Sequence, residues 1–194
     1  MAYNVTVVKQ NSLDAFGRNR VSEAVNIFDS KQLFDGRTIY WSTSTATGGL
    51  QTYDGYKSST LMSVTSSVGS QAVKQTKRRF NYRAGQSLQI YNSFVMGASV
   101  PGVTKRIGYF DGYNGVFFED DGYAKRMVLR SSVTGTTVDG YIDQPDWNID
   151  KLDGYGGSGL TLDLTKIQNL VIDFSWLGAG TIRIGFFSLA FLGE

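Results

Sequence analysis

The sequence predicts an all-β protein, an antiparallel β-sandwich of the jelly-roll type. Short apolar segments are separated by Gly, Asp, Asn and Ser, and helical periodicity is almost absent. Gly accounts for 23 of the 194 residues and Pro for only 2. Asp-Gly pairs stand between apolar runs, where they favour tight hairpins. Many short strands at short spacing are typical of sandwiches and barrels.

In the first half of the chain, alternation of apolar and polar residues predicts the strands. The turn Asp35-Gly36 divides the second expected strand from the third, and the polar run 42–49 is expected to be a loop. The expected strands of this half cover residues 5–8, 25–28, 38–42, 58–66, 72–83 and 87–96.

In the second half, strands are expected around a loop at 111–115 and a turn at 120–122, and one helical turn is allowed at 165–169. The Gly-rich stretch 146–158 is the longest expected irregular loop. The expected strands cover residues 104–110, 116–119, 123–132, 136–142, 160–164, 170–176 and 181–192. Because no linker or change of composition divides the chain, we expect an N-terminal arm over 1–24 and a single sandwich domain over 25–194.

Two absences exclude most familiar chemistry. The chain has no Cys and no His, so it can hold neither a disulfide framework nor a typical zinc site. Nucleophile systems that need His are excluded as well. We therefore expect a protein that is not an enzyme and that has no cofactor, apart from the calcium ion considered below.

Charge and hydropathy indicate no special partner. The net charge is +2 and the pI is about 8.7, which is weak for a dedicated nucleic-acid binder. We expect no secretory leader, because the first residues contain no apolar h-region, and no transmembrane helix, because no apolar run is long enough. We expect no contact with a membrane and none with nucleic acid.

Several long, collinear stretches carry a family resemblance. They are NSLDAFGRNRVS (11–22), FDSKQLFD (28–35), KRRFNYRAG (77–85), RIGYFD (106–111), NGVFFE (114–119), WNIDKLDG (147–154) and LVIDFSWLG (170–178). Together they resemble a family of tailed-bacteriophage virion structural proteins, common in marine phages and mostly of unassigned role. The resemblance implies a location in the virion, as a capsid decoration or a tail or baseplate component. It also implies contacts with other virion proteins and with copies of itself, a trimer being consistent with jelly-roll virion proteins as a class. The family has no catalytic motif to transfer.

The tripeptide Asp-Gly-Tyr occurs five times at irregular spacing, with its tyrosines at 56, 113, 123, 141 and 155. Turn chemistry alone explains Asp-Gly, so the simplest expectation is that each Tyr begins the next strand and packs across it. Alternatively, the rings form a contact or glycan-binding surface, because Tyr offers a large rigid area at low entropic cost. The candidate ligand-binding residues are Tyr113, Tyr123, Tyr141, Trp147 and Tyr155.

Residues 146–153 alternate oxygen-bearing side chains, as calcium ligands often do. The candidate ligands are Asp146, Asn148, Asp150 and Asp153. The EF-hand pattern fails, because Lys151 stands where that loop needs Gly. The competing interpretation is a loop whose side chains cap its own backbone.

Two further clusters have structural as well as functional interpretations. The basic strand 74–83 could grip a nucleic-acid backbone, but its charge divides between two faces, with Lys77, Arg79 and Arg83 on one of them. Glu119, Asp120 and Asp121 could support an Asp-dependent glycan hydrolase, but neighbours in one turn do not meet the required separation of two carboxyl groups.

The last expected strand, 181–192, is apolar on both faces. Such a strand needs cover on both sides, either from a central position in the sheet or from a partner chain. The predicted interface residues are Phe16, Arg18, Arg20, Phe186, Phe187, Leu189, Phe191 and Leu192. The leading hypothesis is a virion structural protein that acts through subunit contacts, and the alternative is a carbohydrate-binding module for host attachment.

Overall fold

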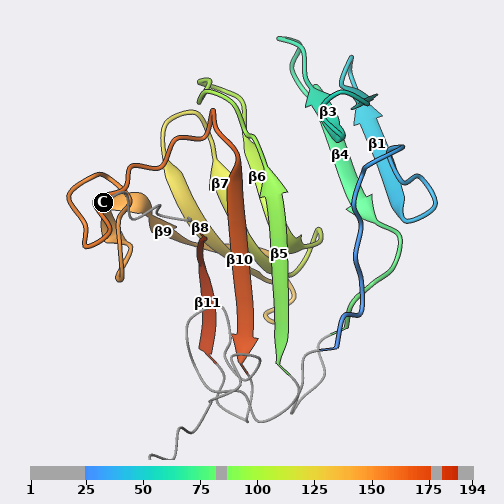
Figure 1. Ribbon diagram of the computed structural model, residues 1–194. Helices are drawn as coiled ribbons and strands as arrows, with labels where there is room; N and C mark the ends of the chain where they lie inside the picture. The colour runs from blue at the N-terminus through green and yellow to red at the C-terminus, as the bar shows by residue number, and fades with distance from the viewer. Residues whose placement is uncertain (1–24, 82–86, 176–180, 188–194) are drawn as a thin grey trace, which may run out of the picture. The chain divides into compact units, whose positions relative to one another are not determined.

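The structure is a computed structural model that describes residues 25–81, 87–175 and 181–187. Within these ranges it is almost entirely β, with antiparallel pairing throughout and one 3₁₀ turn, η2 (Gln144–Asp146). The chain divides into two compact units, Met1–Asn81 and Tyr82–Glu194. We call them the N-terminal unit and the sandwich unit. The predicted class, an all-β antiparallel sandwich, is confirmed (Figure 1).

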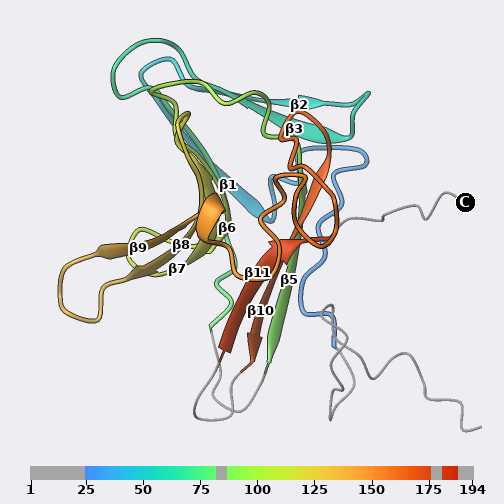
Figure 2. The ribbon, with the colours of Figure 1, turned by 90° about the vertical axis from the view of Figure 1, so that its left-hand side faces the viewer.

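The sandwich unit contains two sheets. The strands of the first, in spatial order, are β11 (Thr181–Phe186), β10 (Gln168–Ser175) and β5 (Leu88–Phe94). The strands of the second are β6 (Lys105–Phe110), β7 (Gly115–Asp120), β8 (Lys125–Ser131) and β9 (Val138–Asp143). Figures 1 and 2 show the two sheets as separate layers. The second sheet is a meander in chain order, so the finer prediction of a jelly-roll topology is not confirmed.

The hydrophobic core lies between these sheets. Its buried residues from the strands are Val116, Phe118, Met127, Leu170 and Ile172. Alternation along β7 explains the pattern, because Val116 and Phe118 point to the core while Phe117 points to the other face. The connecting segments add Trp147, Leu162 and Leu164.

The N-terminal unit contains two strand pairs, β1 (Trp41–Ala46) with β4 (Gln71–Thr76) and β2 (Leu50–Asp54) with β3 (Ser59–Ser63). A polar cluster lies inside it. The Lys74 ammonium donates to Gln32 Oε1 at 3.0 Å and to the Thr60 hydroxyl, and it lies 5.2 Å from the centre of the Trp41 ring. Burial lowers the pKa of Lys74, because the charged form loses hydration.

Beside this cluster, Phe28 contacts three rings, those of Tyr40, Trp41 and Phe80, at centroid distances of 5.1–6.1 Å. Even so, no residue between 25 and 81 is fully buried. Two-stranded pairs are marginally stable on their own, so residues 25–81 have a much weaker core than the described part of the sandwich unit.

Several predicted elements differ from the structure. Residues 25–28 form no strand, and the N–H of Phe28 donates to Asn26 Oδ1 rather than to a neighbouring strand. The polar run 42–49, predicted as a loop, contains most of β1, where β-branched threonines suit a strand. β2 was not predicted, and residues 160–164 form only an isolated bridge between Thr161 and Asp153.

The strand predicted over 181–192 ends at Phe186 within the described residues, and it lies at the edge of its sheet, paired with β10 alone. A central position is therefore wrong for β11. Its inner face, with Ile184 and Phe186, packs on the core. The division into two units also differs from the predicted single domain over 25–194. The predicted arm, 1–24, lies outside the described residues.

The buried position of Phe118, which is 0% exposed, predicts a large loss of stability for Phe118→Ala. We expect about 3–5 kcal/mol, because the substitution removes apolar contacts and leaves a cavity. The matched control is Val133→Ala, at a side chain 90% exposed, which should change the unfolding free energy by less than about 0.5 kcal/mol. Urea unfolding followed by circular dichroism measures both. Equal midpoints for Phe118→Ala and the parent protein would contradict this description of the core.

Candidate functional site

The segment after β9 gathers several of the predicted site residues around one hollow of about 360 Å³. The predicted residues at this hollow are Trp147, Asn148, Asp150, Asp153 and Tyr155, and Ile149, Lys151 and Gly156 complete its lining. We call residues 143–163 the acidic loop, because it carries five Asp and a single Lys.

Hydrogen bonds close the acidic loop at its base. Gln144 Nε2, in η2, donates to the carbonyls of Lys151 and Leu152 at 2.8 and 3.1 Å. The N–H of Leu162 donates to the Leu152 carbonyl at 2.8 Å, and that of Gly154 to the Leu160 carbonyl at 3.0 Å. These bonds fix the backbone around the hollow, although the segment contains little regular structure.

Trp147 anchors the acidic loop in the core. Its ring is 9% exposed, stacks on Phe186 at 6.1 Å and meets Phe118 edge-on at 6.4 Å. The indole N–H donates to the Ile142 carbonyl at 3.2 Å. Trp147 also lines the hollow, so its role as a ligand-binding residue stays a prediction. Phe186 packs against the core, because β11 turns it toward Trp147 and Phe118. Its predicted interface role stays a prediction.

Asp150 holds the tip of the acidic loop. Its two carboxylate oxygens accept the N–H groups of Leu152 and Ser158, both at 2.8 Å. These bonds lower the pKa of Asp150, because they stabilise the ionised form. Gly156 permits this closure, since a Cβ there would lie 2.3 Å from Asp150 Oδ1.

The predicted calcium ligands do not form a cluster. Asp153 accepts the N–H of Tyr155 at 2.9 Å, and Asp146 ends η2 without lining the hollow. In the ranges that the structure describes, no three Asp or Glu side chains lie together as metal ligands would. The geometry favours the competing interpretation, in which these side chains cap the backbone of their own loop.

The repeated Asp-Gly-Tyr forms an Asx turn in four of its five copies. The Asp carboxylate accepts the N–H of the Tyr two residues later at 2.8–3.0 Å, for tyrosines 56, 113, 123 and 155. The four rings are 67–104% exposed. The expectation that each Tyr begins a strand and packs across it is thus wrong for these four, because the Asx turn keeps the Tyr at the turn itself.

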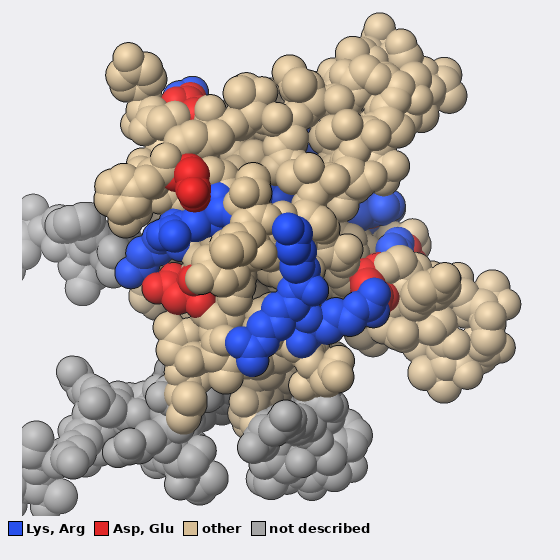
Figure 3. Space-filling model, turned by 90° about the vertical axis from the view of Figure 1, so that its right-hand side faces the viewer, with Lys and Arg blue, Asp and Glu red and all other residues tan. Residues whose placement is uncertain are grey.

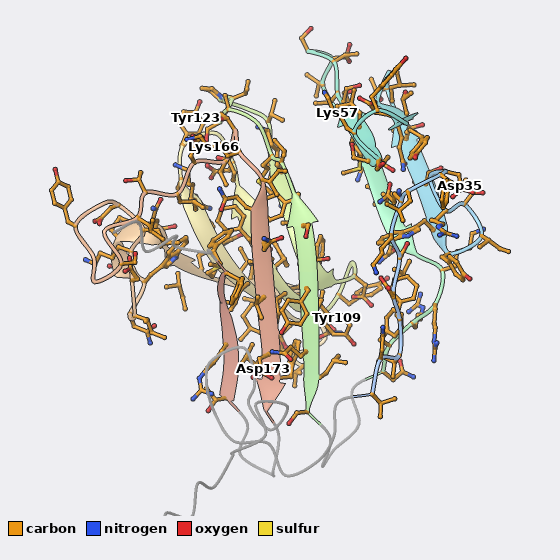
Figure 4. All side chains as sticks on the ribbon, viewed as in Figure 1. Asp35, Lys57, Tyr109, Tyr123, Lys166 and Asp173 are labelled. Atoms are coloured by element: carbon orange, nitrogen blue, oxygen red, sulfur yellow. The ribbon has the colours of Figure 1, made fainter. Side chains whose placement is uncertain are left out.

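These exposed rings do not make one continuous surface. Tyr113 lies in the turn before β7 and Tyr123 in the turn after it, so the two occupy opposite ends of that strand. Figure 4 labels Tyr123 in its turn (Figure 4). Tyr141 differs from both, because it lies within β9 and contacts the Arg126 guanidinium at 5.0 Å. Of the predicted ligand-binding tyrosines, only Tyr155 lies at the hollow.

Ion pairs cover the outer face of the four-stranded sheet. Four residues lie directly opposite one another across its strands, in the order Arg106, Glu119, Arg126, Asp143. Arg106 Nε lies 2.6 Å from Glu119, and Arg126 Nε lies 3.3 Å from Asp143. Glu119 is 3% exposed, so its charge is buried but compensated on both sides.

A second pair completes this face. Arg130 donates two hydrogen bonds of 2.8 Å to the carboxylate of Asp139. The guanidiniums of Arg106 and Arg130 lie 5.7 and 5.2 Å from the Phe117 ring, which they help to cover. Cation–π and bidentate contacts of this kind are well suited to hold a sheet face rigid.

The carboxylates once considered for hydrolysis point in different directions. Glu119 faces outward to Arg106, whereas Asp120, its neighbour in β7, lies on the opposite face with Lys105 Nζ at 3.8 Å. Asp121 caps the following turn and binds Arg126 at 2.6 Å. No carboxylate pair with a shared cleft arises from this cluster.

The basic segment extends beyond the end of its strand. β4 ends at Thr76, so the predicted division of residues 77–79 between two strand faces is wrong. Arg78 donates to the Ile27 carbonyl at 3.0 Å, while Lys77, Arg78 and Arg79 are all exposed. Figure 3 shows Lys and Arg side chains gathered on one face of the molecule (Figure 3).

Exposed apolar side chains of the N-terminal unit were not predicted as functional. Among them, Phe34 is 84% and Ile39 is 75% exposed. The full set is Val25, Ile27, Leu33, Phe34, Ile39, Tyr40, Leu50, Tyr56, Leu61, Met62, Val64 and Val68. The signal for this exposed surface in the sequence is a cluster of apolar residues in a segment that has neither helical nor strand periodicity. Of the predicted interface residues, Phe187 is 48% exposed, and Phe16, Arg18, Arg20, Leu189, Phe191 and Leu192 lie outside the described residues.

Comparison with known proteins found no match to a family model, to a curated protein or to a solved structure. In the part of the chain that the structure describes, no helix is long and apolar enough to cross a membrane.

The Arg130–Asp139 pair predicts a pH-dependent contribution to stability. The hydrogen bonds from Arg130 hold the pKa of Asp139 below its ordinary value of 3.8. A depressed carboxyl pKa stabilises the fold above the ordinary value and loses this effect as the pH falls through the folded-state pKa. Asp139→Asn should therefore cost about 1 kcal/mol near pH 7, the size of a partly screened pair.

Urea unfolding between pH 7 and pH 2.5 measures this effect. The stability difference between Asp139→Asn and the parent protein should shrink as the pH falls below about 4. Asp146→Asn is the matched control, because Asp146 is exposed and makes no ion pair with a described residue. A difference for Asp139→Asn that stays constant across the pH range would count against the pair.

Proposed function

We propose that this protein is a structural subunit of a phage virion, a capsid decoration or a tail or baseplate component that acts through contacts with other protein chains. One observation carries the proposal: between residues 25 and 81 no residue is fully buried, while twelve large apolar side chains are exposed. The resemblance to virion structural proteins, which spans residues 11 to about 185, supports the same role.

The exposed apolar side chains of the N-terminal unit favour a partner that covers them. Soluble monomers rarely expose large contiguous apolar patches, and such patches mark interaction sites. Burial of apolar area contributes about 25 cal/mol per Å², so a partner that covers these side chains would stabilise two otherwise marginal strand pairs. A subunit of an assembly receives this cover from its neighbours, which include other copies of this chain, in a trimer or another closed or repeating arrangement.

The sandwich unit fits such a role as a rigid platform. On its charged outer face, Glu119 and Asp139 are each paired to arginine. Contact rather than catalysis is the chemistry that these residues support, since the carboxylates are held by cations or by backbone N–H groups.

Carbohydrate binding is the second candidate function, favoured by one observation. The Tyr155 ring, 95% exposed, lies beside a hollow lined by carboxylate and amide side chains. Aromatic rings with nearby polar groups can bind sugars, and a virion protein for host attachment could combine both roles.

Quantitative mass spectrometry of gradient-purified particles from a source lysate tests the leading proposal. We expect this chain to copurify with the particles at a fixed ratio to the major coat protein. A ratio near one would assign it to the capsid, and a few to tens of copies per particle to the tail, baseplate or fibre. Absence from washed particles would refute the virion role.

A glycan array with the purified protein tests the second candidate. Tyr155→Ala should abolish a saturable signal, because the exposed ring is removed, while Tyr56→Ala in the N-terminal unit is the matched control. A signal that survives Tyr155→Ala would exclude this hollow as the sugar site.

A further inference from the structure

We propose that the N-terminal unit of one copy docks on the acidic loop of a second copy, in a head-to-tail contact. The inference rests on the proposed function, because it names the partner that covers the exposed apolar surface of a virion subunit. The partner is this chain itself, and the contact joins two different surfaces.

The first surface combines apolar and basic side chains. Phe34 and Ile39 protrude from a segment that forms no strand, and Lys77, Arg78 and Arg79 follow the end of β4. Lys77 and Arg79 form no ion pair with any described residue, so their charges are available to a partner. Over residues 1–81, ten Lys and Arg stand against five Asp and Glu, a net charge of +5.

The second surface, the acidic loop, is complementary to the first in its charge and in its exposed apolar area. The acidic loop has five Asp and one Lys, a net charge of −4. Asp143 and Asp163 are paired with Arg126 and Lys166, outside the loop, which leaves Asp146, Asp150 and Asp153 to face a partner. Ile149 and Tyr155, 82% and 95% exposed, line its hollow and offer apolar area to an incoming side chain such as Phe34. Residues 82–194 as a whole have nine Lys and Arg against twelve Asp and Glu, a net charge of −3.

Charge also decides which surfaces meet. Two N-terminal units, both strongly positive, repel each other, whereas a positive and a negative surface attract and steer the encounter. A contact between unlike surfaces is heterologous, so it generates closed rings or open chains of subunits rather than a simple two-fold dimer. Rings and repeating chains are compatible with the proposed role in a virion.

The backbone of the acidic loop is preorganised for such a contact. Asp150 and Gln144 fix its backbone through hydrogen bonds, and Trp147 anchors it in the core. A partner that binds a preformed loop avoids most of the cost of ordering it.

Analytical ultracentrifugation of the full chain with charge-swapped variants tests the contact. Lys77→Glu/Arg79→Glu should weaken self-association at least about tenfold at low salt, and so should Asp146→Lys/Asn148→Lys. Neither substituted pair makes a side-chain hydrogen bond with described residues, and circular dichroism checks that each variant folds. Lys57→Glu, at an exposed position on the same unit as Lys77, is the matched control and should stay within about twofold of the parent protein.

A mixture of the two charge-swapped variants distinguishes the proposed contact from general repulsion. The glutamates of one variant face the lysines of the other, so the mixture should associate again, as should a chain that carries both sets of changes. Failure of both to recover association would overturn the proposal.

Cross-linking identifies the copies that touch. Unlabelled and ¹⁵N-labelled chains are mixed at high salt, returned to low salt and treated with a carbodiimide, which joins a Lys amine to an Asp or Glu carboxylate as an amide. We expect cross-links of mixed isotope between the N-terminal unit and residues 143–163. Cross-links within one isotope only would mean that each N-terminal unit covers its own chain, and they would overturn the proposal. A protein that stays monomeric at all concentrations would overturn it as well. So would self-association that nuclease abolishes, because that result would assign the basic surface to nucleic acid.

Failure here is distinguishable from failure of the proposed function. A chain that copurifies with particles but gives no cross-links of mixed isotope is a virion subunit whose neighbour is another protein. A chain that associates head-to-tail but is absent from particles keeps the contact and loses the virion role.

Discussion

The contact among Phe118, Trp147 and Phe186 is the interaction on which the sandwich unit depends. The three rings come from β7, the acidic loop and β11, and each touches the other two at centroid distances of 5.1–6.4 Å. Through them one sheet packs on the other and the irregular segment 143–163 becomes part of the core. Among residues 143–150, Trp147 alone is fully buried, and it also lines the hollow.

The two units show how differently one chain can satisfy its polar groups. In the sandwich unit, buried charges such as Glu119 are compensated by arginines across neighbouring strands, and Asp carboxylates close the turns. In the N-terminal unit the inner cluster is itself polar, with Lys74, Gln32 and Thr60 joined by hydrogen bonds. A polar centre of this kind gives specificity of packing but little apolar burial, which is why the apolar side chains of this unit remain outside.

Sequence patterns predicted the sandwich unit better than the N-terminal unit, for a physical reason. Strands β5 to β10 have apolar residues on at least one face and Asp-Gly or Gly turns between them, so period and turn chemistry agree. β1 (WSTSTA) and β2 (LQTYD) are mostly polar and contain no fully buried residue, so no apolar period marked them. The packing of Trp147 on Phe186 was not predicted, because sequence does not reveal that a loop and an edge strand cover each other across the core.

The exposure of the tyrosines follows from the Asp-Gly turn, which the sequence does reveal. The position of each Tyr relative to that turn was predicted wrongly. In an Asx turn the Asp accepts the N–H of the residue two positions later, so that residue lies at the turn and cannot begin the strand. Four of the five Asp-Gly-Tyr copies obey this rule, and their rings are therefore held outward by their own backbone. The fifth, Asp139-Gly-Tyr141, escapes because Arg130 binds the Asp139 carboxylate from the neighbouring strand. One competing ion pair thus decides whether the same tripeptide forms a turn that presents an aromatic ring or a strand residue.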